Sequence, residues 1–179
     1  MIILTNKTLQ YLIYNRLYSA SMYELLATQA PTNILQTQMK LYQEETLNNV
    51  SYLDRYYQEL NTSSYHPIVK EPANQGSFKK NIYWMLEYES SSTKLFCNES
   101  YNANNDEKIK TLTSYISSSI VQRNTKLTNI YINILDEEIK KTPGIIIKKQ
   151  GQDGFGGTIF PIEYKKGKVK IMNDIDKAL

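Results

Sequence analysis

The chain contains very little cysteine and histidine, and this scarcity excludes several kinds of site. Its 179 residues include one cysteine, Cys97, and one histidine, His66. A single thiol cannot form a disulfide within the chain or build a cysteine-based zinc site, and it fits a reducing compartment. The sequence therefore predicts neither a disulfide framework nor a structural zinc site.

Long hydrophobic runs are also missing. The apolar start of the chain, residues 1–4, breaks at Thr5, so it is too short for the hydrophobic part of a signal peptide. No stretch approaches the roughly 20 apolar residues that a membrane span requires. From the sequence we expect a cytoplasmic protein.

Glycine is nearly absent from the first 143 residues, where only Gly76 occurs, while the other six glycines lie between residues 144 and 167. Glycine costs up to about 1 kcal/mol in a helix interior, so its absence favours long helices. Pro31, Pro67, Pro72 and Pro143 fall between the periodic segments. Helices are predicted over residues 7–29, over 33–60, from about 77 through Phe96, and from 107 to about 134.

Each predicted helix carries a stripe of apolar or tyrosine side chains at spacings of three and four residues. In the second helix this stripe also passes through Thr46. Thr32-Asn33 can cap the second helix, and Asn104 with Glu107 three residues later is a plausible reciprocal cap for the fourth. Such helices must bury their stripes against one another, so residues 1–139 are predicted to form an antiparallel four-helix bundle in a mainly α protein.

Residues 140–179 have a different composition and are predicted to form a separate C-terminal extension. Residues 144–149, 158–164 and 168–172 are short strand-like runs, and Lys165, Lys166 and Gly167 suit a hairpin turn. The glycine-rich residues 151–157 lack the Lys-Ser/Thr pair of a phosphate-binding loop, so they are interpreted as a flexible connector. The extension can lie on the bundle or pair with another copy through its strand edges.

The net charge is only +3, which does not indicate a strong preference for polyanions. Nucleic-acid binding remains a weaker alternative, because basic residues gather towards the C-terminal end. These are Lys140, Lys141, Lys148, Lys149, Lys165, Lys166, Lys168 and Lys170. The 15 tyrosines follow helical spacing without basic residues between them, which favours packing in a core over stacking on bases.

Several segments of the first two helices have a familiar pattern. These are Tyr18-Ser-Ala-Ser-Met-Tyr-Glu-Leu-Leu-Ala27, then Ala30-Pro31, then Tyr42-Gln-Glu-Glu-Thr-Leu-Asn48, then Tyr56-Tyr57-x-x-Leu60. Together with residues 78–96 and 120–131, they make residues 8–135 resemble a ferritin-like, rubrerythrin-type domain. The resemblance does not extend to the C-terminal extension.

The resemblance implies where a di-metal site would stand. Such a site takes a Glu from each of two helices and a Glu-x-x-His from each of the other two, all facing inward. The corresponding positions in this chain are Ser19, then Glu45 with Asn48, then Glu89 (with Glu87 as the alternative), then Val121 with Asn124.

Asparagine therefore replaces both of the expected histidines, and two carboxylates are missing. The resemblance thus implies a degenerate ligand set, too small for a conventional di-iron or di-manganese centre. We expect no catalytic residues, no bound metal and no cofactor.

If Glu45 and Glu89 face the interior, they need partners, because an isolated buried carboxylate is strongly destabilised. We expect a polar core in which Asn48, Asn124 and Ser19 replace the metal bonds, and to which Arg16 or Arg123 can add a positive charge. A register shifted by one residue would instead place both carboxylates on the surface, and this alternative stays open.

A retained scaffold without its metal ligands predicts a non-catalytic structural or protein-interaction module, acting as a homodimer or with another protein. The content of Lys, Ile, Asn and Tyr resembles that of AT-rich bacterial genomes. Because similar proteins occur in spore-forming Firmicutes, a spore-associated role is one expectation. The alternative is a metal-dependent oxidoreductase, such as an oxidase, peroxidase or catalase-like enzyme, using Glu45, Glu89 and Glu24.

Overall fold

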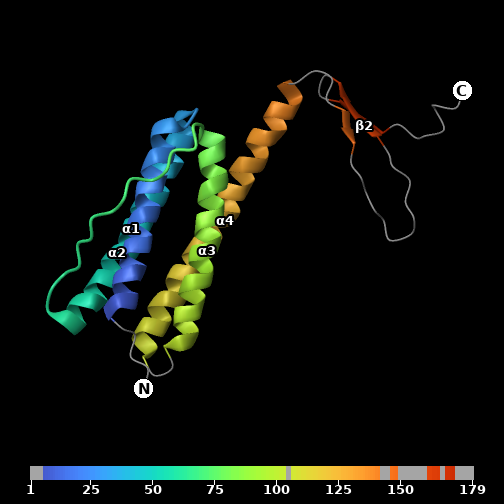
Figure 1. The fold of residues 1–179 in the computed structure, drawn as a ribbon. Helices are drawn as coiled ribbons and strands as arrows, with labels where there is room; N and C mark the ends of the chain where they lie inside the picture. Colours follow the sequence, from blue (N-terminus) through green and yellow to red (C-terminus); the bar gives the residue numbers. More distant parts are fainter. Residues whose placement is uncertain (1–5, 104–105, 142–145, 149–160, 166–167, 172–179) are drawn as a thin grey trace, which may run out of the picture. The chain divides into compact units, whose positions relative to one another are not determined.

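A computed structural model describes residues 6–103, residues 106–141 and three short strands. The helices are α1 (Asn6–Gln29), α2 (Asn33–Asn61), α3 (Phe78–Asn102) and α4 (Glu107–Lys141). The strands are β1 (Ile146–Lys148), β2 (Pro161–Lys165) and β3 (Lys168–Ile171). Helices α1, α2, α3 and the first part of α4 lie side by side (Figure 1), so the prediction of four packed helices is confirmed.

Short polar side chains set the helix boundaries. The hydroxyl of Thr32 accepts a hydrogen bond from the backbone N–H of Leu35 and so caps α2, as predicted. Ser77 caps α3 in the same way through Lys80. At α4 the capping side chain is Asp106, whose Oδ1 accepts hydrogen bonds from the backbone N–H groups of Lys108 and Ile109. The predicted cap at Asn104 lies outside the described residues.

Hydrogen bonds between helix ends fix the helix directions. The side chains of Asn6 and Asn61 bond to each other and place the start of α1 beside the end of α2. Asn81 Nδ2 donates to Gln29 Oε1 over 2.6 Å and places the start of α3 beside the end of α1. Both α2 and α3 are therefore antiparallel to α1.

Helix α4 runs in the same direction as α1. The Tyr56 hydroxyl donates to the carboxylate of Asp106 and joins the end of α2 to the start of α4. Cys97 Sγ lies 3.0 Å from Ser117 Oγ, so the last part of α3 faces the first part of α4. Helices α2 and α3 thus run in the same direction, and the segment between them must cross the length of the bundle (Figure 1).

Turn residues and side-chain hydrogen bonds hold this long connection at both ends. Thr62 adopts the left-handed conformation (φ 59°), and its N–H bonds to the Gln58 carbonyl at the end of α2. Gly76 has φ +87° immediately before α3, a conformation that side chains disfavour. The backbone N–H of Gln75 donates to Asn81 Oδ1 over 2.8 Å.

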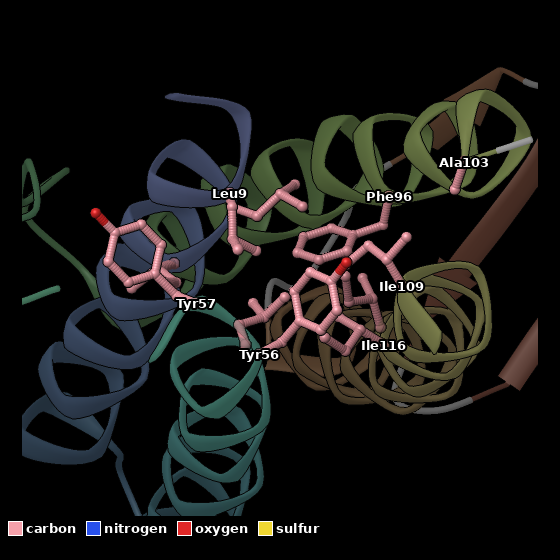
Figure 2. Close-up of a cluster of buried hydrophobic side chains, with 11 residues drawn as sticks. Leu9, Tyr56, Tyr57, Phe96, Ala103, Ile109 and Ile116 are labelled. Carbon is pink, nitrogen blue, oxygen red and sulfur yellow. The ribbon is translucent and has the colours of Figure 1, made fainter. Parts of the chain in front are cut away.

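A compact apolar cluster fills one end of the bundle, near the start of α1 and of α4. Its buried members are Leu9, Leu12, Ile13, Leu53, Tyr56, Tyr57, Phe96, Ala103, Ile109, Ile116 and Ile120. Figure 2 shows Tyr56, Phe96 and Ile109, from three different helices, pointing toward one another. Burial of side chains this large, at about 25 cal/mol per Å² of apolar surface, is the main force that holds the helices together.

The chain separates into two compact units, Met1–Tyr131 and Ile132–Leu179. In the second unit β2 pairs antiparallel with both β1 and β3. The predicted glycine-rich connector, residues 151–157, lies outside the described residues. The predicted domain boundary between residues 139 and 140 stays a prediction.

None of the four described helices is long and apolar enough to cross a membrane.

Candidate functional site: a buried polar layer

A layer of polar side chains crosses the middle of the bundle, where an apolar core would normally continue. All four helices contribute to it. Its fully or almost fully buried members are Arg16 and Ser19 from α1, Thr46 and Asn49 from α2, Glu89 and Ser92 from α3, and Arg123 from α4. Charged side chains are seldom fully buried unless they are paired. The layer is therefore the candidate functional site of the bundle.

The centre of the layer is an ion pair between α1 and α3. Arg16 Nη1 lies 2.9 Å from Glu89 Oε2, and both side chains have no exposed surface. Asn15 Oδ1 accepts hydrogen bonds from Arg16 Nε at 2.9 Å and from Arg16 Nη2 at 2.6 Å. The guanidinium also lies 5.2 Å from the ring centroid of Phe96, at the edge of the apolar cluster. Arg16 is thus held on three sides by a carboxylate, an amide and an aromatic ring.

Further hydrogen bonds extend this network across α1 and α3. Asn15 Nδ2 donates to Ser92 Oγ at 3.1 Å and to Tyr88 Oη at 2.9 Å. The Tyr23 hydroxyl donates to Glu89 Oε1 at 3.4 Å. Together these bonds provide the partners that a buried charge requires.

The second arginine of the layer is less completely paired. Arg123 Nη1 donates to Ser119 Oγ at 2.7 Å and lies 3.6 Å from Glu45 Oε2. The Arg123 side chain is 1% exposed, whereas that of Glu45 is 39% exposed. Among the described residues, Arg123 Nε and Nη2 and Asn49 Nδ2 have no hydrogen-bond partner. Because an unpaired buried donor costs about 1–3 kcal/mol, these atoms are the weak points of the layer.

Burial keeps the tyrosines around the layer protonated. Loss of solvation raises the pKa of Tyr23 well above 10.0, and the neighbouring Glu89 carboxylate raises it further, against a smaller opposing effect of Arg123 and Arg16. Loss of solvation also raises the pKa of Tyr88. Both hydroxyls therefore act as neutral hydrogen-bonding groups at physiological pH.

The six positions at which the resemblance places the metal ligands do not form one cluster in the structure. Ser19 and Glu89 are buried in the layer. Glu45 stands at its edge and faces Arg123. Asn48 and Val121 are exposed, and Asn124 Nδ2 donates over 3.3 Å to Ser90. The alternatives Glu24 and Glu87 are also exposed.

The expectation that Asn48, Asn124 and Ser19 replace the metal bonds is therefore wrong. Asn48 points to the surface, Asn124 bonds to Ser90, and Ser19 Oγ has no hydrogen-bond partner among the described residues. In α2 the inward positions are Thr46 and Asn49, each one residue after the expected position. This displacement of one residue is about 100° around a helix, enough to turn a side chain from the core to the surface.

One feature of the sequence indicates which face of α2 is buried. The predicted stripe of α2 passes through Thr46, and Asn49 follows three residues later on the same face. Arg16 and Arg123 were predicted only as optional charge partners, and Arg16 is the one that pairs with Glu89.

The side chains of this layer do not fit a di-metal centre. The one fully buried carboxylate, Glu89, is already paired with a guanidinium, and a second guanidinium lies in the same layer. Two fixed positive charges repel a metal cation, and the nearest amide and hydroxyl groups are weak ligands for iron or manganese. Within the described residues, no three His, Cys, Asp or Glu side chains are grouped closely enough to hold a metal ion.

Other sequence candidates lie away from the layer. His66 is exposed in the connection between α2 and α3, and Cys97 is partly buried beside Ser117. Of the C-terminal lysines, Lys140 pairs with Asp136, and Lys141 lies 3.9 Å from Glu137. The side chains of the remaining six lysines lie outside the described part of the chain.

The sequence matches no known protein-family model and no curated protein sequence.

Proposed function

We propose that this chain is a non-catalytic structural or protein-interaction module built on a ferritin-like scaffold, in which a buried ion pair replaces the metal centre. The observation that carries the proposal is the pair Arg16–Glu89, with both side chains fully buried. A guanidinium there supplies the positive charge that a carboxylate at this depth requires. The layer then holds the helices together without a metal.

The path of the chain supports the ferritin-like part of the proposal. Ferritin-like bundles contain one long crossover connection, which makes the second and third helices run in the same direction. The connection between α2 and α3 is of this kind. A simple up-down-up-down bundle would need only short loops.

The metal content of the purified full-length chain tests the absence of a metal centre. The protein is incubated anaerobically with Fe(II) or Mn(II), desalted and measured by elemental analysis. We expect much less than one metal ion per chain, and the same value for Glu45→Ala. Near-stoichiometric iron or manganese that is lost in Glu45→Ala or Glu89→Ala, but retained in the exposed control Glu71→Ala, would favour the oxidoreductase alternative.

The partner in this proposal is a second copy of the chain. A groove of about 780 Å³ lies between the last part of α2 and the first part of α4. It is lined mainly by apolar surface, with the half-exposed rings of Tyr52 and Tyr115 at one end. Exposed aromatic side chains beside an apolar groove are typical of protein contacts.

Light scattering after size-exclusion chromatography tests self-association. We expect a dimer that Thr111→Glu weakens, because Thr111 is exposed and lines this groove. The matched control is Thr125→Glu, which is exposed on the same helix but away from the groove. A monomeric wild-type chain at micromolar concentrations would contradict self-association and leave only another protein as partner.

A further inference from the structure

A pocket lined by aromatic rings and lysines opens between the start of α3 and the later part of α4. Its volume is about 340 Å³, within the range of small-molecule sites, about 300–1,000 Å³. The lining residues are Gln75, Lys79, Lys80, Tyr83, Trp84 and Tyr131. This aromatic pocket lies within the first compact unit. It is far from the groove between α2 and α4, because the start of α3 and the start of α4 lie at opposite ends of the bundle (Figure 1).

Three rings form the apolar part of the aromatic pocket, and contacts with other rings hold them in place. Tyr83 is 54% exposed and packs against Tyr131, with ring centroids 6.0 Å apart. Trp84 is partly buried, and its ring lies 6.1 Å from that of Tyr18 on α1 and 6.4 Å from that of Tyr88. The rings are thus positioned before a ligand arrives, which lowers the entropy cost of binding.

The spacing of these rings favours a flat ligand that lies against them. The rings of Tyr83 and Tyr131 are too close to admit a third ring, since two stacking contacts of roughly 3.5 Å each would need about 7 Å between them. A ligand ring therefore lies against the exposed surface of Tyr83, with Trp84 beside it. Stacking of this kind holds nucleobases on aromatic side chains, and it accepts every base.

The charges around the aromatic pocket favour an anion. Lys79 and Lys80 line it, and none of the other lining residues is charged. Both lysines stand in the first turn of α3, which contains no acidic residue. A first turn normally favours Asp or Glu, because the backbone N–H groups make that end of a helix positive. Two lysines there strengthen the positive potential, and exceptions to such local rules tend to mark functional sites.

Basic and aromatic side chains share one face of α3 at this place. Lys80 precedes Trp84 by four residues, and Lys79 precedes Tyr83 by four, so each lysine lies one helical turn before a ring. An anionic group attached to a stacked ring can therefore reach an ammonium group. Arginine is favoured where a planar carboxylate is held by two bonds, whereas lysine binds phosphate as a point charge. Because the lining contains lysines and no arginine, phosphate is the better match.

From these observations we propose that the aromatic pocket binds a mononucleotide. The base stacks on Tyr83 beside Trp84, and Lys80 pairs with the phosphate, whose charge is about −1.5 to −2 at pH 7. The exposed amide of Gln75 both donates and accepts hydrogen bonds, so it can bond to the ribose or to the edge of the base. The inference goes beyond the scaffold role and does not depend on it.

The fluorescence of Trp84 measures this binding directly, because Trp84 is the single tryptophan of the chain and lines the aromatic pocket. The full chain is titrated with AMP and UMP. The nucleosides adenosine and uridine lack the charge, and inorganic phosphate lacks the ring. We expect a saturable change with at least one nucleotide, and binding about tenfold weaker or less for its nucleoside and for phosphate.

Two results of this titration would overturn the proposal. One is no saturable response to either nucleotide at millimolar concentrations, both in fluorescence and in saturation-transfer NMR. The other is a nucleoside that binds as tightly as its nucleotide, because the lysines would then contribute nothing.

Variants at two exposed positions separate the roles of charge and ring. Lys80→Gln should weaken binding of the nucleotide about tenfold and leave the nucleoside unchanged, since the charge acts on the phosphate alone. Tyr83→Ser should weaken both, because it removes the stacking surface. The matched controls are Lys94→Gln and Tyr101→Ser, exposed on α3 outside the aromatic pocket, which should change neither. Unchanged binding in Lys80→Gln or in Tyr83→Ser would overturn the proposal.

A single-stranded nucleic acid carries the same bases and phosphates, so a hexamer of the nucleotide that binds is a further probe. We expect its affinity to lie within about tenfold of that of the free nucleotide, because the aromatic pocket holds one base. A hexamer that binds more than about a hundredfold tighter would assign this surface to single-stranded nucleic acid and would overturn the assignment to a free nucleotide.

Discussion

At the scale of single residues, Arg16 and Glu89 each depend on the other. Both side chains are removed from water, and their charges compensate each other across 2.9 Å. Removing one partner of a buried ion pair costs about 3–5 kcal/mol, whereas replacing both with apolar side chains is often neutral or stabilising by about 1–4 kcal/mol. The pair therefore gives the core a defined arrangement more than it gives net stability.

The dependence of Arg16 and Glu89 on each other can be measured with variants of the pair. We expect Glu89→Gln to lower the free energy of unfolding by about 3–5 kcal/mol, because it leaves the Arg16 charge without a counter-charge. Arg16→Met combined with Glu89→Met should recover most of that loss. Urea denaturation near neutral pH measures both, with Glu87→Gln, exposed on the same helix, as the control. A loss of less than about 1 kcal/mol in Glu89→Gln would mean that solvent reaches the carboxylate.

Tyr23 gives the layer a sensitivity to alkaline pH. Burial raises the pKa of its hydroxyl well above 10.0 in the folded chain, so the unfolded chain loses this proton first. The stabilising contribution of the neutral hydroxyl is fully present below pH 10.0 and is lost as the pH rises towards the folded-state pKa.

We expect the free energy of unfolding to fall above about pH 10 by about 1.4 kcal/mol per pH unit for each such tyrosine. Tyr23→Phe should reduce the slope of the free energy of unfolding against pH by the contribution of one tyrosine. Tyr101→Phe, at an exposed position at the end of α3, should leave the slope unchanged. Urea denaturation at a series of pH values measures the slope. Equal slopes in Tyr23→Phe and the wild-type chain would contradict a proton held by burial.

At the scale of helices and connections, Asp106 links the end of α2 to the start of α4. One carboxylate oxygen caps α4 through two backbone N–H groups, and the other accepts a hydrogen bond from Tyr56. The hydrogen bond from Tyr56 is the main reason that the pKa of Asp106 is lowered from 3.8, and the two backbone bonds add to it. The ionised form is thus the one that the folded chain favours.

We expect Asp106→Ala to lower the free energy of unfolding by about 1–2 kcal/mol near neutral pH, since both the cap and the tyrosine bond are lost. Asp106→Asn keeps the capping oxygen but replaces the oxygen that accepts from Tyr56 with an NH2 group, so its deficit should be smaller than that of Asp106→Ala. The pKa of Asp106 is lowered in the folded chain, so the ionised carboxylate stabilises the fold above pH 3.8. The difference in free energy of unfolding between the wild-type chain and Asp106→Ala should therefore be largest there and should shrink as the pH falls further. Urea denaturation from neutral to acidic pH, with the exposed Glu71→Gln as control, measures it; a deficit that grows towards acidic pH would contradict the assignment.

The helices were predictable from the sequence because their boundaries depend on local chemistry. Glycine and proline are excluded from helix interiors for reasons of backbone entropy and geometry, and Thr32 caps α2 through a neighbouring N–H group. The cap that the structure shows for α4, Asp106, was not singled out in the sequence, because the residue three positions later is Ile109 and not a glutamate or glutamine. A tertiary contact, the bond from Tyr56, favours Asp106.

The polar layer was only partly predictable, because its partners are distant in sequence. Arg16 and Glu89 are 73 residues apart, and charged side chains are normally expected on the surface. The resemblance placed Glu45 inward, while the apolar stripe through Thr46 indicated the neighbouring register that the structure has. Where the two signals disagreed, helical periodicity was the better guide, because it reports directly which face is buried.

At the scale of the whole molecule, all described buried side chains lie between Leu9 and Leu127. The apolar cluster and the polar layer are thus contained in the first compact unit, Met1–Tyr131. The free energy of folding of a unit comes mainly from the surface that it buries. The bundle should therefore hold its structure without the C-terminal residues.

A chain that ends at Lys141 tests this independence, since it keeps the whole of α4, including its last-turn lysines. We expect the truncated chain and the full chain to unfold at the same urea concentration, because removal of residues 142–179 leaves every described buried contact in place. Circular dichroism at 222 nm should show the same helical signal per molecule for both. A midpoint that falls on truncation, with an unchanged dependence on urea, would show that the C-terminal residues stabilise the bundle through contacts of their own. The predicted division into two domains would then be wrong.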